Sequence, residues 1–144
     1  MKDNKKTDIR CRAIIVYQDK ILVVKHSEKS GFYALPGGHL EWGENVKDCM
    51  IREIIEELGV KPELGRLLVV KNFIDKNNEQ SIEFYFEVIN SADYLDIEKL
   101  GGTHKYELFD ICWIGKNDSR EIKPSQIQTD LNNGTFFSDV VRFL

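Results

Sequence analysis

Three glutamates stand close together near the middle of the chain. Glu53, Glu56 and Glu57 are spaced i, i+3 and i+4, which puts their carboxylates on one patch of an α-helix. Like charges at this spacing repel and destabilise an isolated helix, whereas a hard divalent cation would neutralise them. Oxygen-only ligands favour Mg²⁺ or Mn²⁺. The spacing alone leaves two interpretations open: a metal site, or a solvated acidic face whose repulsion Lys47 and Arg52 soften.

The glutamates fall in a segment that the sequence predicts to be a helix over 46–58. Asn45 is a good N-cap residue with Asp48 three positions later, and Gly59 stands where a C-cap glycine belongs. Apolar side chains repeat at i, i+3, i+4 and i+7, which predicts a stripe packed on a sheet. The members of this stripe are Ile51, Ile54, Ile55 and Leu58. At about 100° per residue, the glutamate patch should lie nearly opposite the stripe.

Runs of β-branched and aromatic residues predict strands on both sides of this helix. They cover 13–17, 21–25, 33–35, 67–73, 82–89 and 109–114. The first two runs are separated by only three residues and should form a hairpin. Pro124 and Gly134 bracket a second helix that carries Ile127 and Leu131. Strands mixed with two clear helices predict a layered α/β domain.

Composition limits the size, the partners and the location of the protein. The chain of 144 residues fits a single domain over 1–144, with 1–8 as a frayed polar tail. Its 20 basic and 24 acidic residues give a net charge of −4, so long nucleic acid is not an expected partner. A small anionic substrate remains compatible if a bound cation locally reverses the field. The absence of a long apolar run or a secretory leader predicts a cytoplasmic protein with no membrane association.

The three cysteines are far apart in the sequence and form no metal-binding pattern. Cys11, Cys49 and Cys112 stand among apolar neighbours, where a cysteine behaves as a small hydrophobic residue. They are expected to be buried, reduced thiols with no catalytic or disulfide role.

The segment from Gly38 to Val60 resembles a known motif, the Nudix box. The box is written Gly-x5-Glu-x7-Arg-Glu-U-x-Glu-Glu-x-Gly-U, where U is a bulky aliphatic residue, and this chain meets every specified position. The matching residues are Gly38, Glu44, Arg52, Glu53, Ile54, Glu56, Glu57, Gly59 and Val60. The chain is thereby identified as a Nudix hydrolase. The resemblance implies an α/β/α sandwich around a mixed β-sheet, with the box forming a loop–helix–loop that binds metal.

The same resemblance implies a reaction and roles for the box residues. The activity would be Mg²⁺-dependent hydrolysis of a phosphoanhydride bond, with Mn²⁺ as the alternative ion. Glu53, Glu56 and Glu57 would carry the metal, helped by a backbone carbonyl of Gly37 or Gly38. Glu53 is the first choice for the base that deprotonates the water, and Glu56 is the alternative. Arg52 and Glu44 would orient and balance the cluster.

Residues outside the box are weaker candidates for the site. Glu107 is matched loosely to a further metal-binding glutamate of the family, and the alternative is an ordinary solvated glutamate. Phe73, Tyr85 and Trp113 are the candidates for stacking on a base, against the alternative that they pack in the core. Trp42, in the box loop, would lie near the substrate or cover the loop. The three histidines, His26, His39 and His104, form no ligand cluster and are interpreted as incidental.

The substrate is narrowed by features that some Nudix groups carry and this chain lacks. Asp75 and Lys76 stand about fifteen residues past the box, where a proline would mark the ADP-ribose group and a tyrosine the dinucleoside polyphosphate group. Nucleoside triphosphates, oxidised ones included, are therefore the leading substrate class, followed by nucleoside diphosphate sugars. The alternative from another class is a nucleotide-sensing module without catalysis. Loss of box glutamates would mark such a module, and all of them are present.

Overall fold

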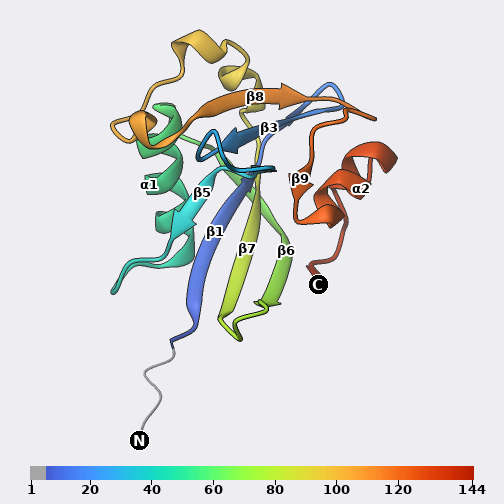
Figure 1. The fold of residues 1–144 in the computed structure, drawn as a ribbon. Coiled ribbons are helices and arrows are strands. Elements are labelled where there is room, and N and C mark those ends of the chain that lie inside the picture. The colour runs from blue at the N-terminus through green and yellow to red at the C-terminus, as the bar shows by residue number, and fades with distance from the viewer. Residues whose placement is uncertain (1–5) are drawn as a thin grey trace, which may run out of the picture.

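The structure is a computed structural model that describes residues 6–144, and within them two helices flank two β-sheets. Figure 1 shows α1 on one side of the strands and α2 on the other, the layered α/β arrangement that the sequence predicted. The helices are α1 (Val46–Leu58) and α2 (Ser125–Asn133). The strands are β1 (Asp8–Ile14), β2 (Val16–Tyr17), β3 (Lys20–Lys25), β4 (Tyr33–Ala34), β5 (Gly37–His39), β6 (Leu64–Ile74), β7 (Gln80–Val88), β8 (Asp110–Ile114), β9 (Ile122–Lys123) and β10 (Arg142–Phe143).

The first sheet has the order β10-β6-β7-β1-β5 and carries the entry into α1. Strand β1 runs parallel to β7 and antiparallel to β5, so Cys11 lies between Phe84 and Gly38. Asp8 begins β1 instead of ending a frayed tail, and the expected tail at 1–5 lies outside the described residues. Gly37 has φ +147, and an added Cβ would meet the Cys11 carbonyl oxygen at 1.9 Å. Glycine at this position therefore allows the box loop to lie directly against β1.

The second sheet is built on the predicted hairpin. Strands β2 and β3 pair antiparallel, and Gln18 and Asp19 turn the chain with φ of 46° and 62°. Strand β8 pairs antiparallel with β3, and the pair β4–β9 continues the sheet. Three short 3₁₀ turns lie between β7 and β8, at Ser91–Tyr94, Ile97–Lys99 and Lys105–Glu107. This connection returns the chain to the end of α1, where the Gly101 amide donates to the Leu58 carbonyl at 3.1 Å.

Helix α1 has the bounds and caps that the sequence predicted. The Asn45 side chain accepts from the Asp48 amide at 2.9 Å, and Gly59 is left-handed with its N–H on the Ile55 carbonyl. The predicted apolar stripe is only partly right: Ile54 and Leu58 are fully buried, whereas Ile55 is 40% exposed. The buried face is instead rotated about the helix axis, because Cys49, Met50 and Glu57 share it with Ile54 and Leu58.

Helix α2 and the end of the chain cover the other side. Pro124 is the N-cap and Gly134 the left-handed C-cap, and Ile127 and Leu131 are buried as expected. Cys11 and Cys49 are buried and Cys112 is partly buried, and all three are free thiols. Neither helix within residues 6–144 is long and apolar enough to cross a membrane.

Candidate active site

The site lies where strand β5 meets helix α1. The amide of Gly37 donates to Oε2 of Glu57 at 3.2 Å, so the loop is fixed to the third box glutamate. A Cβ on Gly38 would meet the carboxylate of Glu53 at 2.5 Å. Two glycines therefore keep the backbone in contact with two glutamates: a side chain at Gly38 would meet Glu53 on the helix, and one at Gly37 would meet the backbone of β1.

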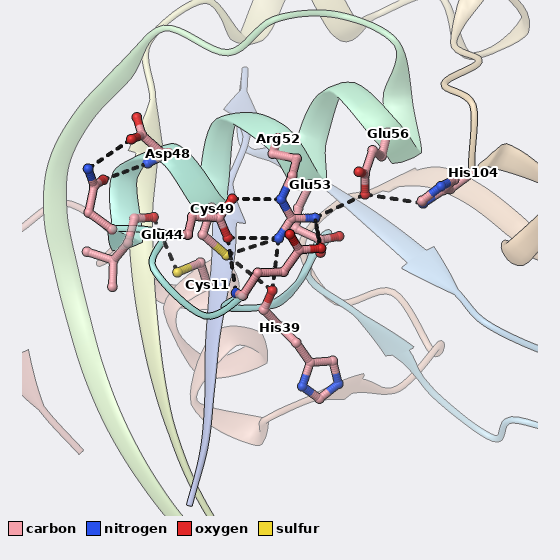
Figure 2. Close-up of polar contacts among 12 residues, drawn as sticks. Cys11, His39, Glu44, Asp48, Cys49, Arg52, Glu53, Glu56 and His104 are labelled. Carbon is pink, nitrogen blue, oxygen red and sulfur yellow. Dashed lines mark hydrogen bonds and ion pairs between the residues drawn. The ribbon is translucent and has the colours of Figure 1, made fainter.

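Arg52 holds three partly buried glutamates together (Figure 2). Its Nε donates to Glu44 at 2.7 Å and its Nη2 donates to the other oxygen of Glu44 at 2.9 Å. Its Nη1 donates to Glu53 at 2.9 Å and to Glu56 at 3.2 Å. Such a two-pronged contact with a carboxylate fixes the guanidinium plane. Arg52 thus contacts Glu44, Glu53 and Glu56 at once, and the orienting role expected for Arg52 and Glu44 stays a prediction.

The Arg52–Glu44 pair is ionised under all ordinary conditions. Hydrogen bonds from Arg52, followed by one from the Glu41 amide, lower the pKa of Glu44 to about 2 against the opposing effect of burial. The pKa of Arg52 is raised because Glu44 and Glu53 accept its hydrogen bonds. Arg52 therefore brings a permanent positive charge to the carboxylates that line the site.

Glu57 lies in a different environment from the one that the helix pattern predicted. It is 6% exposed and belongs to the buried side of α1, so its expected position opposite the core is wrong. Burial raises the pKa of Glu57 to about 8, and the hydrogen bond from Gly37 and the nearby Arg12 only partly offset it. Burial also raises the pKa of Glu53 above its usual range, against the hydrogen bond from Arg52. Two of the three carboxylates therefore hold their protons more tightly than free glutamates do.

His104 contacts the glutamate cluster although no sequence pattern singled it out. Its Nδ1 lies 3.2 Å from Oε2 of Glu56, and its amide donates to the Glu56 carbonyl at 2.7 Å (Figure 2). The interpretation of all three histidines as incidental therefore needs correction for His104. Glu107, the loosely matched candidate, lies on the same 3₁₀ turn with its carboxylate 4.0 Å from His104. Its side chain is 55% exposed, so it borders the cluster and is not bonded into it.

A cavity of about 510 Å³ reaches Leu35, just before the box in the sequence, and takes in two of the three aromatic candidates. Phe73 and Tyr85 line it, but Tyr85 is fully buried and offers no exposed ring face for stacking. Trp113 packs against the core and donates from Nε1 to the Tyr94 carbonyl at 3.2 Å, away from the cavity lining. Trp42 is fully exposed in the box loop.

Arg12 connects this cavity to the glutamates. It lines the cavity, its Nη1 donates to the Leu35 carbonyl at 3.3 Å, and its charge lowers the pKa of Glu57. The cavity carries more positive than negative side chains, in contrast to the protein as a whole. Its charged residues are Arg10, Arg12, Lys71 and Lys123 with Glu83 and Glu121. An anionic ligand extending from the glutamates would therefore meet compensating charge.

The donor set fits a hard divalent cation. Glu53, Glu56, Glu57 and the backbone at Gly38 supply only oxygen, the ligand type of Mg²⁺ and Mn²⁺. The raised pKa values of Glu53 and Glu57 mark carboxylates whose charge is under-compensated, which a cation would correct. Within residues 6–144, no group of three or more His, Cys, Asp or Glu side chains is arranged as a ready metal cluster. In this arrangement each of the three glutamate carboxylates is bonded through one oxygen, to Arg52 or to Gly37.

Comparison with known proteins identifies the class. A family model described as the NUDIX domain matches residues 8–129. The chain therefore belongs to the Nudix family, and the identification as a Nudix hydrolase is confirmed. In the solved structures, a MutT NUDIX hydrolase from Burkholderia pseudomallei is similar with a TM-score of 0.68 and 25% identity, over 88% of this chain and 98% of that one. An ADP-ribose pyrophosphatase from Streptococcus suis shares the fold, with a TM-score of 0.65 and 22% identity over 96% and 100% of the two chains.

Two curated relatives carry more specific names. An ADP-ribose pyrophosphatase from Methanocaldococcus jannaschii is 40% identical over 102 residues, which cover 60% of each chain. A diphosphoinositol polyphosphate phosphohydrolase 3-alpha from Mus musculus is 33% identical over 79 residues, covering 55% of this chain and 46% of the relative. The chain thus spans about half the length of the curated relatives it matches.

Proposed function

We propose that the protein hydrolyses a phosphoanhydride bond in a small molecule built on a nucleoside diphosphate, using Mg²⁺ or Mn²⁺. The observation that carries this proposal is the contact of Gly37 and Gly38 with Glu57 and Glu53, together with a cationic cavity whose Arg12 also acts on Glu57. A phosphoanhydride resists attack because its negative charge repels hydroxide, and a bound divalent ion supplies the charge neutralisation that the reaction needs. Glu53, Glu56, Glu57 and the Gly38 carbonyl would hold that ion.

The side chains of the box and of Arg12 have separate roles in the proposed reaction. Glu53 accepts the proton of the attacking water, and its raised pKa brings it closer to the range in which a general base is effective. Arg52, held on both oxygens of Glu44, keeps Glu53 and Glu56 in place through Nη1. Glu56 is the alternative base and is held by His104 on its other side. Arg12 reaches from the cavity toward the cluster and balances charge on the substrate.

Among the possible substrates we place ADP-ribose first. The support is the relative named ADP-ribose pyrophosphatase, at 40% identity over 102 residues. Nucleoside triphosphates come second, supported by the resemblance to the MutT structure at 25% identity. The sequence alone placed nucleoside triphosphates first, because Asp75 and Lys76 stand where the markers of other groups would be. Both classes contain the nucleoside diphosphate that the proposal requires.

A hydrolysis screen with Mg²⁺ or Mn²⁺ tests the proposal. ADP-ribose should give AMP and ribose 5-phosphate, and a nucleoside triphosphate should give the monophosphate and pyrophosphate, both resolved by ion-exchange chromatography. Release of inorganic phosphate alone would mean that a different bond is cut. Tight nucleotide binding without any product would instead support the nucleotide-sensing module.

A further inference from the structure

Glu83 is a buried carboxylate that faces the cavity and has an unused oxygen. It lies on β7, is 6% exposed and lines the cavity. Its Oε1 accepts from the Tyr85 hydroxyl at 3.1 Å and lies 3.7 Å from Nε of Arg12. Among residues 6–144, its Oε2 receives no hydrogen bond. A buried acceptor that opens on a cavity is suited to a ligand group that donates a hydrogen bond.

The same cavity offers aromatic surface for a flat ring. Two phenylalanines line the cavity: Phe32, which directly precedes β4, and Phe73, which lies in β6. The ammonium of Lys123 lies 4.6 Å from the Phe32 ring centroid, and that of Lys71 lies 4.7 Å from the Phe73 centroid. Long lysine side chains on a ring face are readily exchanged for a stacked ligand, because their stems are flexible. Aromatic walls around a buried acceptor fit a heteroaromatic ring that carries an N–H group.

The contacts of Glu83 also set how many donors it can take. Because Oε1 already faces Tyr85 and Arg12, only Oε2 is free, which fits a single amino group better than two adjacent ring donors. We propose that Glu83 selects the nucleobase, with Oε2 accepting a hydrogen bond from the exocyclic amino group of adenine. This inference rests on the proposed function, in which the substrate contains adenosine diphosphate. Glu83 is thus a specificity-determining residue in the cavity that Arg12 also lines.

Replacing Glu83 by glutamine should reverse the preference. Two donors, Tyr85 and Arg12, point at the Oε1 position, so the amide oxygen of the variant takes that place. The amide NH₂ then occupies the Oε2 position and presents a donor to the ligand. AMP carries an amino group at this point of the ring and IMP carries an oxo group, so the two ligands report on the change directly.

Calorimetric titration of AMP and IMP into the whole protein tests the proposal without turnover. The parent should bind AMP about tenfold or more tightly than IMP, and Glu83→Gln should lower or invert that ratio by a similar factor. Glu87→Gln is the matched control, since Glu87 is on the same face of β7 and pairs with Arg66 at 3.5 Å but does not line the cavity. The control should keep the parent ratio.

Each outcome either supports the inference or overturns it. Equal affinities of the parent for AMP and IMP overturn it without any variant, so the test survives a Glu83→Gln protein that fails to fold. A folded Glu83→Gln protein with the parent ratio also overturns it. If the parent hydrolyses ADP-ribose but Glu83→Gln keeps the parent's ratio of AMP affinity to IMP affinity, the inference is refuted and the proposed function stands. A ratio that depends on Glu83, in a protein that cuts no nucleotide, would refute the proposed function instead.

Discussion

Replacing Glu57 by glutamine should make the metal-free protein more stable, and increasingly so as the pH rises. Burial raises the pKa of Glu57 from an ordinary 4.5 to about 8, so the folded chain holds this proton more tightly than the unfolded chain. Between these two pH values the folded state binds more protons, and stability therefore falls as the pH rises through that window. A difference of about 3.5 pKa units corresponds to on the order of 5 kcal/mol above pH 8, at about 1.4 kcal/mol per unit. Glutamine has no charge to bury and still accepts from the Gly37 amide.

The assay is urea unfolding of parent and Glu57→Gln in excess chelator, at several pH values from 5 to 8.5. The two proteins should differ by less than about 1 kcal/mol at pH 5, close to the ordinary pKa of 4.5, and should diverge by several kcal/mol at pH 8.5. Groups that titrate in both proteins cancel in the difference. Added Mg²⁺ should reverse the order at high pH, because metal binding competes with the proton and stabilises the parent. A difference that stays constant across this pH range would refute the assignment of a buried, proton-holding Glu57.

Three further predictions follow from the same contacts. Chelation should stop hydrolysis and added Mg²⁺ should restore it, and full activity in a metal-stripped sample would contradict the proposed chemistry. Ile54→Ala should cost ~2–5 kcal/mol because Ile54 is fully buried, whereas Ile55→Ala, at a side chain 40% exposed, should cost less than ~1 kcal/mol in the same urea titration. Arg52→Lys should lower kcat by about tenfold or more with little change in KM. The reason is that lysine cannot bond both oxygens of Glu44 and still reach Glu53. An unchanged kcat in steady-state kinetics would contradict the positioning role of Arg52.

The parts of the fold that depend on local chemistry could be predicted from the sequence. Asn45 and Gly59 define α1 through hydrogen bonds made within a few residues, and the turn at Gln18 and Asp19 is equally local. The box spacing was sufficient to gather Arg52 with Glu44, because both lie on or beside one helix.

The parts that depend on packing between distant segments could not be predicted. Helix periodicity predicted that Ile55 would be buried and Glu57 exposed. Strand β5 instead packs against Glu57 and buries it, and Ile55 is exposed. His104 contacts Glu56 because the long connection between β7 and β8 returns to α1, and no local sequence pattern predicts the path of that connection. Glu83 lies in a strand that the sequence predicted, but the local pattern does not indicate that burial and the contact with Tyr85 make it part of a cavity.

Hydrolysis of ADP-ribose by parent and Glu53→Gln proteins tests the central claim most directly. Both should be assayed at saturating Mg²⁺ with AMP and ribose 5-phosphate quantified, beside Glu79→Gln, whose substitution is in the exposed turn between β6 and β7. The parent and the Glu79 variant should release the two products in equal amounts and at equal rates. The Glu53 variant should lose about a hundredfold or more in kcat while remaining folded at the assay temperature. A folded Glu53→Gln protein that hydrolyses ADP-ribose at the parent's rate would contradict the assignment of this helix as the catalytic element.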